Sequence, residues 1–116
     1  MIKNEIIIKK SRFITTLYKI DNVDKVKDIL EDLKKEYKKA THICFAYSIN
    51  GQEKAFDDNE PSHTAGMPIL NVIHLKKLNN ILIVVIRYFG GIKLGAGPLT
   101  RAYSKSASEI IKKLDE

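Results

Sequence analysis

One glycine-rich stretch is the strongest candidate for chemistry in this sequence. Glycines let the backbone turn several amides toward one point, where a phosphate or another anion could bind. The helix that we predict from Pro98 onward would add free N–H groups and a positive dipole end, although proline itself lacks an amide proton. The spacing matches neither a Walker loop nor a dinucleotide fingerprint, so the glycines could equally serve only a tight crossover. The candidate anion site comprises Arg87, Gly90, Gly91, Lys93, Gly95, Gly97 and Arg101.

Basic residues after the glycines extend this candidate site. Arg101, Lys105 and Lys112 fall within a narrow arc of the last predicted helix. Such a stripe suits the regular charges of a sugar-phosphate backbone. A solvated helix face is the equally weighted alternative.

An acidic loop, Asp57-Asp58-Asn59-Glu60, precedes Pro61. Its oxygens could hold Mg²⁺ if a phosphate faced them, but the spacing does not match an EF-hand. We favour a structural role, in which these residues cap a turn or pair with Arg87 or Arg101.

A cysteine and two histidines could support nucleophilic catalysis. His42 and Cys44 alternate on one strand face, and His63 lies in the polar loop. Catalysis would require them within hydrogen-bond reach with an orienting group behind, whereas residues two apart on a strand are separated. We expect Cys44 to be a buried structural residue, and no pair of cysteines has zinc-site spacing.

Composition sets the class of molecule to which these residues belong. The 116 residues, 44% hydrophobic and 29% charged, predict one soluble globular domain over residues 1–116. No signal peptide is apparent, the apolar run 81–86 is too short to span a bilayer, and the single cysteine excludes an intrachain disulfide. We therefore expect a cytoplasmic protein without a membrane partner.

The charge is unevenly distributed. The net charge is +6, and residues 65–113 carry eight bases and one acid. A basic half attracts nucleic acid, phosphorylated ligands or an acidic protein face.

The elements that position these residues follow from hydrophobic periodicity. Residues 2–9, 12–20, 41–49 and 81–86 read as strands, and residues 52–64 as a polar loop. An amphipathic helix begins at residues 21–24, a short apolar helix covers 68–77, and a last helix starts at Pro98. The order β-β-α-β-α-β-α predicts an α+β two-layer sandwich with its helices on one face of a mixed or largely antiparallel sheet.

Three blocks of the sequence together resemble the signature of the IMPACT/YigZ family. The likeness runs from about residue 11 to 111, and its glycine-rich block is highly specific. The blocks are residues 40–47 (ATHICFAY), residues 58–61 and 64–68 (DNEP and TAGMP), and residues 87–97 and 101–103 (RYFGGIKLGAG and RAY).

This resemblance implies a fold like the second domain of ribosomal protein S5, and a link to translation. In the eukaryotic branch the implied partner is a protein, and in the bacterial branch RNA or the ribosome. The resemblance supplies no catalytic mechanism, cofactor or metal. Bacterial members usually continue into a ferredoxin-like domain, which we expect this sequence to lack because it ends at Glu116.

Two further positions depart from the family pattern. His63 stands where a small residue, often glycine, is usual, and it adds a bulky titratable group to the loop. Pro98 stands where a second glycine is usual after Gly97, and it stiffens the connection.

The preferred hypothesis is a non-enzymatic, translation-associated module that binds RNA or a ribosomal surface through Arg87, the glycine loop, Lys93, Arg101 and Lys105. Tyr88 and Phe89 could stack on a base if they face outward.

One alternative is a Mg²⁺-dependent enzyme or a binder of a phosphorylated small molecule, with His42 or His63 as base. Another is a protein-interaction domain with an exposed apolar patch. The sequence leaves the oligomeric state open. The signature-loop residues are His42, Asp57, Asp58, Glu60 and Thr64.

Overall fold

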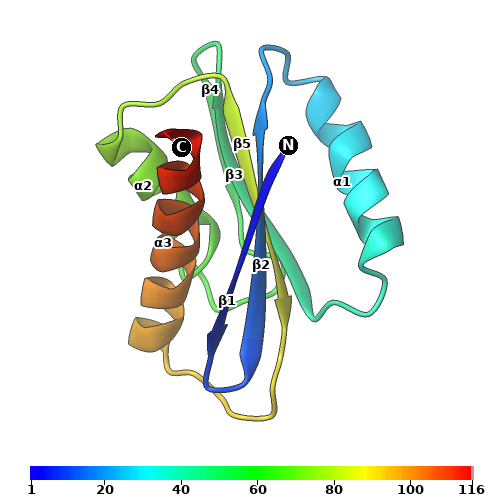
Figure 1. Ribbon diagram of the computed structural model, residues 1–116, viewed down its shortest axis with the longest axis vertical. Helices are drawn as coiled ribbons and strands as arrows, with labels where there is room; N and C mark the ends of the chain where they lie inside the picture. Colours follow the sequence, from blue (N-terminus) through cyan, green and yellow to red (C-terminus); the bar gives the residue numbers. More distant parts are fainter. Residues whose placement is uncertain (116) are drawn as a thin grey trace.

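The computed structural model describes residues 1–115 and contains one five-stranded sheet (Figure 1). The strands lie in the order β1-β2-β5-β3-β4, and every neighbouring pair is antiparallel. The predicted α+β class is confirmed, with β5 at the centre of the sheet. The strands are β1 (Ile2–Ile8), β2 (Ser11–Lys19), β3 (His42–Ile49), β4 (Gln52–Phe56) and β5 (Ile81–Tyr88).

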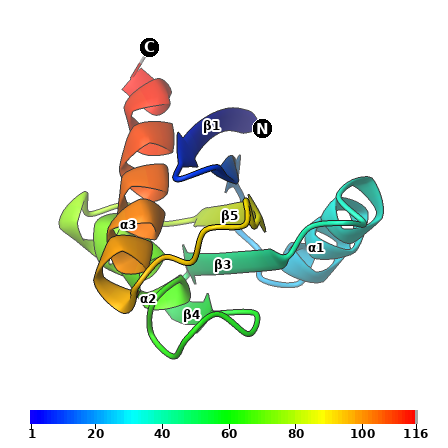
Figure 2. The ribbon, with the colours of Figure 1, turned by 90° about the horizontal axis from the view of Figure 1, so that it is seen from below.

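The helices lie on both faces of the sheet, so the prediction of two layers with helices on one face is wrong. Figure 2 shows the sheet nearly edge-on, with α1 on one side and α2 and α3 on the other. The described residues form α1 (Lys25–Glu36), α2 (Gly66–Leu75) and α3 (Ala96–Lys112), followed by the short 3₁₀ helix η1 (Lys113–Asp115).

The alternation along β3 explains why both faces are covered. Ile43 and Phe45 pack with the apolar stripe of α1, whereas Cys44 and Ala46 pack with α2 and α3. The side chains of β5 divide in the same way, and its non-alternating apolar run is buried on both faces as predicted. Helices on one face alone would leave half of β5 in water.

Strand β4 lies in a segment that the sequence analysis assigned to a polar loop. Gln52 to Phe56 pair with Ile49 to Phe45 after the Asn50-Gly51 turn, whose residues both have positive φ. The strand is largely exposed because it forms one edge of the sheet. Charged residues on an edge strand discourage pairing with other chains, and here they also hide the apolar signal of a strand.

The helix that follows the glycine loop begins two residues earlier than predicted. Gly95 is its N-cap, so Pro98 is the third helical residue and not the first. Proline still fits there, because the first amides of a helix have no intrahelical acceptor. Among residues 1–115, no helix is long and apolar enough to cross a membrane.

Two glycines of this loop should respond differently to a methyl group. A Cβ on Gly90 would lie 2.0 Å from the backbone oxygen of Lys10, whereas one on Gly97 would meet only the mobile Arg101 side chain at 3.3 Å. We expect Gly90→Ala to lower the free energy of unfolding by about 1–3 kcal/mol, measured by urea denaturation. Gly97→Ala should be neutral or stabilising, since alanine favours helix. Equal effects would contradict this contact.

Candidate functional site

The carboxylate of Glu60 is the hub of the site, and it is 3% exposed. Arg87 Nη1 donates to both of its oxygens, at 2.9 and 2.8 Å. The Tyr103 hydroxyl donates at 2.5 Å, and His42 Nε2 lies 3.3 Å away. One side chain from the β4–α2 loop therefore joins β3, β5 and α3.

Arg87 is buried, contrary to the expectation that it would contact a ligand at the surface. Its Nη2 donates to Ser11 Oγ at 3.2 Å, and its guanidinium lies over the rings of Phe13 and Phe89. Because Glu60 neutralises it, Arg87 adds no accessible positive charge. The side chain of a residue at the end of a strand can point toward the neighbouring loops or toward solvent. The position of the residue in the sequence does not distinguish these two orientations.

His42 has both ring nitrogens engaged within the protein. Nδ1 lies 2.8 Å from the carbonyl oxygen of Asp58, and Nε2 faces Glu60. His42 has no hydrogen bond to Cys44, whose single S–H lies within hydrogen-bond distance of the Asp57 carbonyl oxygen, at 3.1 Å, and of the Tyr103 hydroxyl, at 3.4 Å. His42 is therefore a structural bridge and not the base of a nucleophilic pair.

Burial raises the pKa of the Cys44 thiol well above its ordinary value, although the Tyr103 hydrogen bond opposes the shift. Burial likewise raises the pKa of Tyr103, which keeps the proton that it donates to Glu60. The buried structural cysteine predicted from the sequence is confirmed.

The other carboxylates of the acidic loop bind backbone amides. Asp57 Oδ1 accepts from Gly66 N at 2.8 Å and Ala65 N at 3.2 Å, and Oδ2 accepts from His63 N at 2.9 Å. This negative charge satisfies the free amides at the start of α2. Asp58 Oδ2 accepts from Ile43 N at 2.7 Å, and so ties the loop to β3.

These contacts give the magnesium alternative no support. Asp57 and Asp58 point at amides and Glu60 at Arg87, and residues 1–115 contain no group of three or more His, Cys, Asp or Glu side chains arranged to hold a metal. The favoured reading, in which the acids cap a turn and pair with Arg87, is confirmed.

Two further loop residues have structural explanations. Thr64 Oγ1 donates to the Pro61 carbonyl oxygen at 2.5 Å, which closes the turn before α2. His63 is exposed, has a φ of 63°, and contacts Ser62 Oγ through Nδ1. A left-handed backbone favours glycine, which accounts for the small residue expected here in the family.

The glycines of this loop differ in their structural surroundings. Gly90 provides the close approach to the β1–β2 turn, and Gly91 has a φ of 92°. Gly95 caps α3, and the Arg101 guanidinium folds back beside Gly97. The tight-crossover reading therefore explains two of these four glycines, Gly90 and Gly91.

A basic end forms where several loops meet at the lower end of the sheet in Figure 1. The β1–β2 turn lies against Gly90, and the α1–β3 loop is joined to β5 by hydrogen bonds from Thr41 N to Arg87 O and from Phe89 N to Thr41 Oγ1. The acids of the adjoining loop are engaged internally. We call the exposed cations here the basic end: Lys9, Lys10, Lys38, Lys39, Lys93 and Arg101.

Only part of this surface was predicted. Lys93 and Arg101 are exposed as expected, and Lys105 is exposed about one turn beyond Arg101 along α3. Lys9, Lys10, Lys38 and Lys39 were missed, because they flank different strands and come together only through the sheet order. The signal available was that each pair stands at a predicted strand end.

A pocket of about 410 Å³ opens beside the basic end and collects residues from all three signature blocks. Its floor is the Glu60–Arg87 pair with His42, and its rim includes Lys93 and Phe89, which is 45% exposed. Tyr88 is half-buried under the Arg12 guanidinium. Of the two aromatic residues considered for stacking, Phe89 is thus the exposed one.

This geometry defines a class of protein: an α+β domain in which three sequence motifs converge on one buried ion pair. The chain belongs to the Impact N-terminal domain family, whose model matches residues 9–111. It is 48% identical over 110 residues to IMPACT family member YvyE of Bacillus subtilis, covering 92% of this chain and 51% of that protein. It is 39% identical over 112 residues to IMPACT family member YigZ of Escherichia coli, covering 92% and 55%.

Two solved structures share the fold. A crystal structure of a hypothetical protein superposes with a TM-score of 0.93 at 36% identity, covering 97% of this chain and 57% of that one. The two-domain translational regulator Yih1 matches with a TM-score of 0.58 at 22% identity, covering 95% and 45%, which shows the fold alone. The chain spans about half the length of the curated relatives that it matches.

Breaking the buried ion pair should strongly destabilise the fold. Glu60→Gln retains the shape but leaves Arg87 as an uncompensated buried charge, which typically costs about 3–5 kcal/mol. Urea denaturation followed by circular dichroism measures this loss. Glu109→Gln, which removes a surface pair with Lys112, should leave the free energy of unfolding nearly unchanged. Similar effects of both variants would refute the central role of Glu60.

The raised pKa of Cys44 predicts an unreactive thiol. At pH 8 we expect alkylation of the native protein to be roughly 100-fold slower than in denaturant, because only the thiolate reacts. Mass spectrometry over time measures both rates. The control Cys44→Ala/Ser62→Cys places the thiol on an exposed residue and should react rapidly when folded. Rapid alkylation of native wild-type protein would indicate an accessible thiolate.

Proposed function

We propose that this chain is a non-enzymatic, cytoplasmic module that acts in translation by binding RNA, including ribosomal RNA, through the basic end. The observation that carries the proposal is the separation of charge. The carboxylates of the acidic loop are hydrogen-bonded to Arg87 and to backbone amides, whereas the cations of the basic end are exposed. A surface of one sign attracts a polyanion.

The arrangement suits phosphate contacts more than base reading. The cations lie on three loops and one helix start, spread across an end of the sheet, and exposed Phe89 is the one aromatic side chain on the adjoining pocket rim. Lysine and arginine at separated points fix a backbone in place without identifying its sequence. We therefore expect affinity for RNA with little sequence preference.

The relatives support only the translation-related part of this proposal. Yih1 is described as a translational regulator, and several other relatives are proteins named IMPACT from vertebrates. The enzyme alternative receives no support from the site, because His42 is engaged on both nitrogens and the acidic side chains bind internal partners.

RNA binding should be steeply dependent on salt. If about four phosphates are neutralised, the affinity for single-stranded RNA falls roughly 50-fold between about 50 and 200 mM salt. Fluorescence anisotropy with labelled single-stranded RNA, duplex RNA and tRNA measures this. Lys93→Glu/Arg101→Glu should reduce the affinity more than 10-fold, because it reverses two charges of the basic end.

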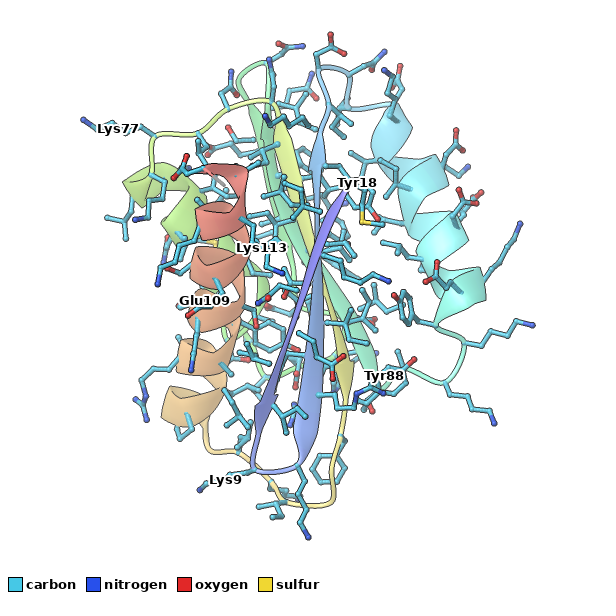
Figure 3. All side chains as sticks on the ribbon, in the orientation of Figure 1. Lys9, Tyr18, Lys77, Tyr88, Glu109 and Lys113 are labelled. Atoms are coloured by element: carbon cyan, nitrogen blue, oxygen red, sulfur yellow. The ribbon has the colours of Figure 1, made fainter. Side chains whose placement is uncertain are left out.

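The control variant reverses two charges at the opposite end of the molecule. Lys76→Glu/Lys77→Glu lies beyond α2, and Figure 3 places Lys77 far from Lys9. It should bind RNA nearly as well as wild type does. Equal losses of RNA affinity in the two variants would show that only the net charge of the protein matters, which would contradict a site at the basic end. The absence of RNA binding at low salt would refute the proposal.

A further inference from the structure

The two faces of the sheet are unequally covered. Strand spacing of about 4.8 Å makes a five-stranded sheet about 19 Å wide between its outer strands, whereas a helix with side chains is about 10–12 Å across. Two helices therefore cover one face, and α1 alone cannot cover the other. In Figure 2, α1 lies beside the middle strands and leaves the β4 edge of its face open.

Strand β4 shows this asymmetry residue by residue. A Cβ on Gly66 would lie 2.4 Å from Phe56 N, so α2 packs directly on one face of β4. Ala55 points to that covered face and packs against its core. On the α1 face, Lys54 is exposed and the Phe56 ring is 41% exposed.

A groove of about 350 Å³ occupies the uncovered space between α1 and β4. Its α1 wall runs from Val26 to Lys34, about 12 Å at 1.5 Å per residue, which is a little over two helical turns, and Val23 extends this wall just before the helix. The sheet wall carries an aromatic cluster, in which Phe45 lies 6.3 Å from Tyr47 and 5.3 Å from Phe56 between ring centroids. The groove is therefore straight, apolar at its base and about as long as a short helix.

The rim of the groove is basic. Lys27, Lys34 and Lys54 line it together with a single acid, Glu31. None of the three lysines has an ion pair within 4.0 Å among the described residues. Lys54 instead lies over the Phe45 ring, with Nζ 5.9 Å from its centroid. The net positive rim calls for an acidic occupant.

We propose that this groove, formed by α1 and strands β3 and β4, is the docking site for an acidic amphipathic helix of a partner protein. An apolar stripe at i, i+3 and i+7 would pack against the partly exposed Val23, Leu30 and Tyr47, and flanking Glu or Asp would pair with the rim lysines. Such a helix would supply the missing second helix on this face. The aliphatic wall favours a helix over RNA, because valine and leucine offer no surface on which a base can stack.

The site is separate from the basic end, so each proposal can fail without the other. The probe is a synthetic, fluorescent amphipathic helix of about 14 residues, with leucines on one face and glutamates beside them. We expect it to bind at least 10-fold more tightly than a scrambled peptide or an analogue with lysines in place of the glutamates. Amide chemical-shift changes should map to α1, β3 and β4.

Variants of exposed residues test the site without disturbing the core. Phe56→Ser and Lys34→Glu/Lys54→Glu should each weaken peptide binding about 10-fold, whereas Leu75→Ser, at a side chain 79% exposed on α2, should not. Equal affinity for the scrambled peptide, or no binding at millimolar concentration, would overturn the proposal. So would displacement of the peptide by RNA, or a dimer of this chain that the peptide dissociates.

Discussion

The buried Glu60–Arg87 ion pair is the interaction on which the rest of this structure depends. Two charges have left water here, and they are tolerated because they neutralise each other and because Tyr103, His42 and Ser11 add polar contacts, although Arg87 Nε is buried without a hydrogen-bond partner. The pair joins a loop, three strands and the last helix at one end of the sheet. It holds loops that are distant in the sequence against one another, and it forms the floor of the neighbouring pocket.

That same arrangement determines the charge of the surface. The loop carboxylates bind Arg87 and backbone amides and therefore do not offset the lysines around them. A chain of modest net charge thus presents a predominantly basic end. In the proposed function, many signature residues of the family would thus act indirectly. Glu60, Asp57, Asp58 and the glycines build and neutralise the loop layer, and the exposed cations are left as the groups that a polyanion could contact.

A second asymmetry lies across the sheet. Two helices complete one face, whereas α1 leaves an apolar and basic groove beside β4 on the other. The chain spans about half the length of the two bacterial relatives described above. The basic end and the groove give the domain two chemically different surfaces, one suited to phosphates and one to an acidic helix.

The amino-acid sequence by itself determined the helices with clear apolar stripes, the buried central strand, the two-faced strand containing Cys44 and the α+β class, because these depend on local periodicity. It also determined the family, because specific motifs identify it. The sequence did not predict β4, because the charged residues of this edge strand mask its apolar pattern. It also did not predict the number of layers, because periodicity shows that a face is buried but not which element covers it. Arg87 and the four additional lysines of the basic end needed the tertiary structure. Whether a cation is neutralised or exposed depends on which loops the strand order brings together, and that is a property of contacts between residues far apart in the chain.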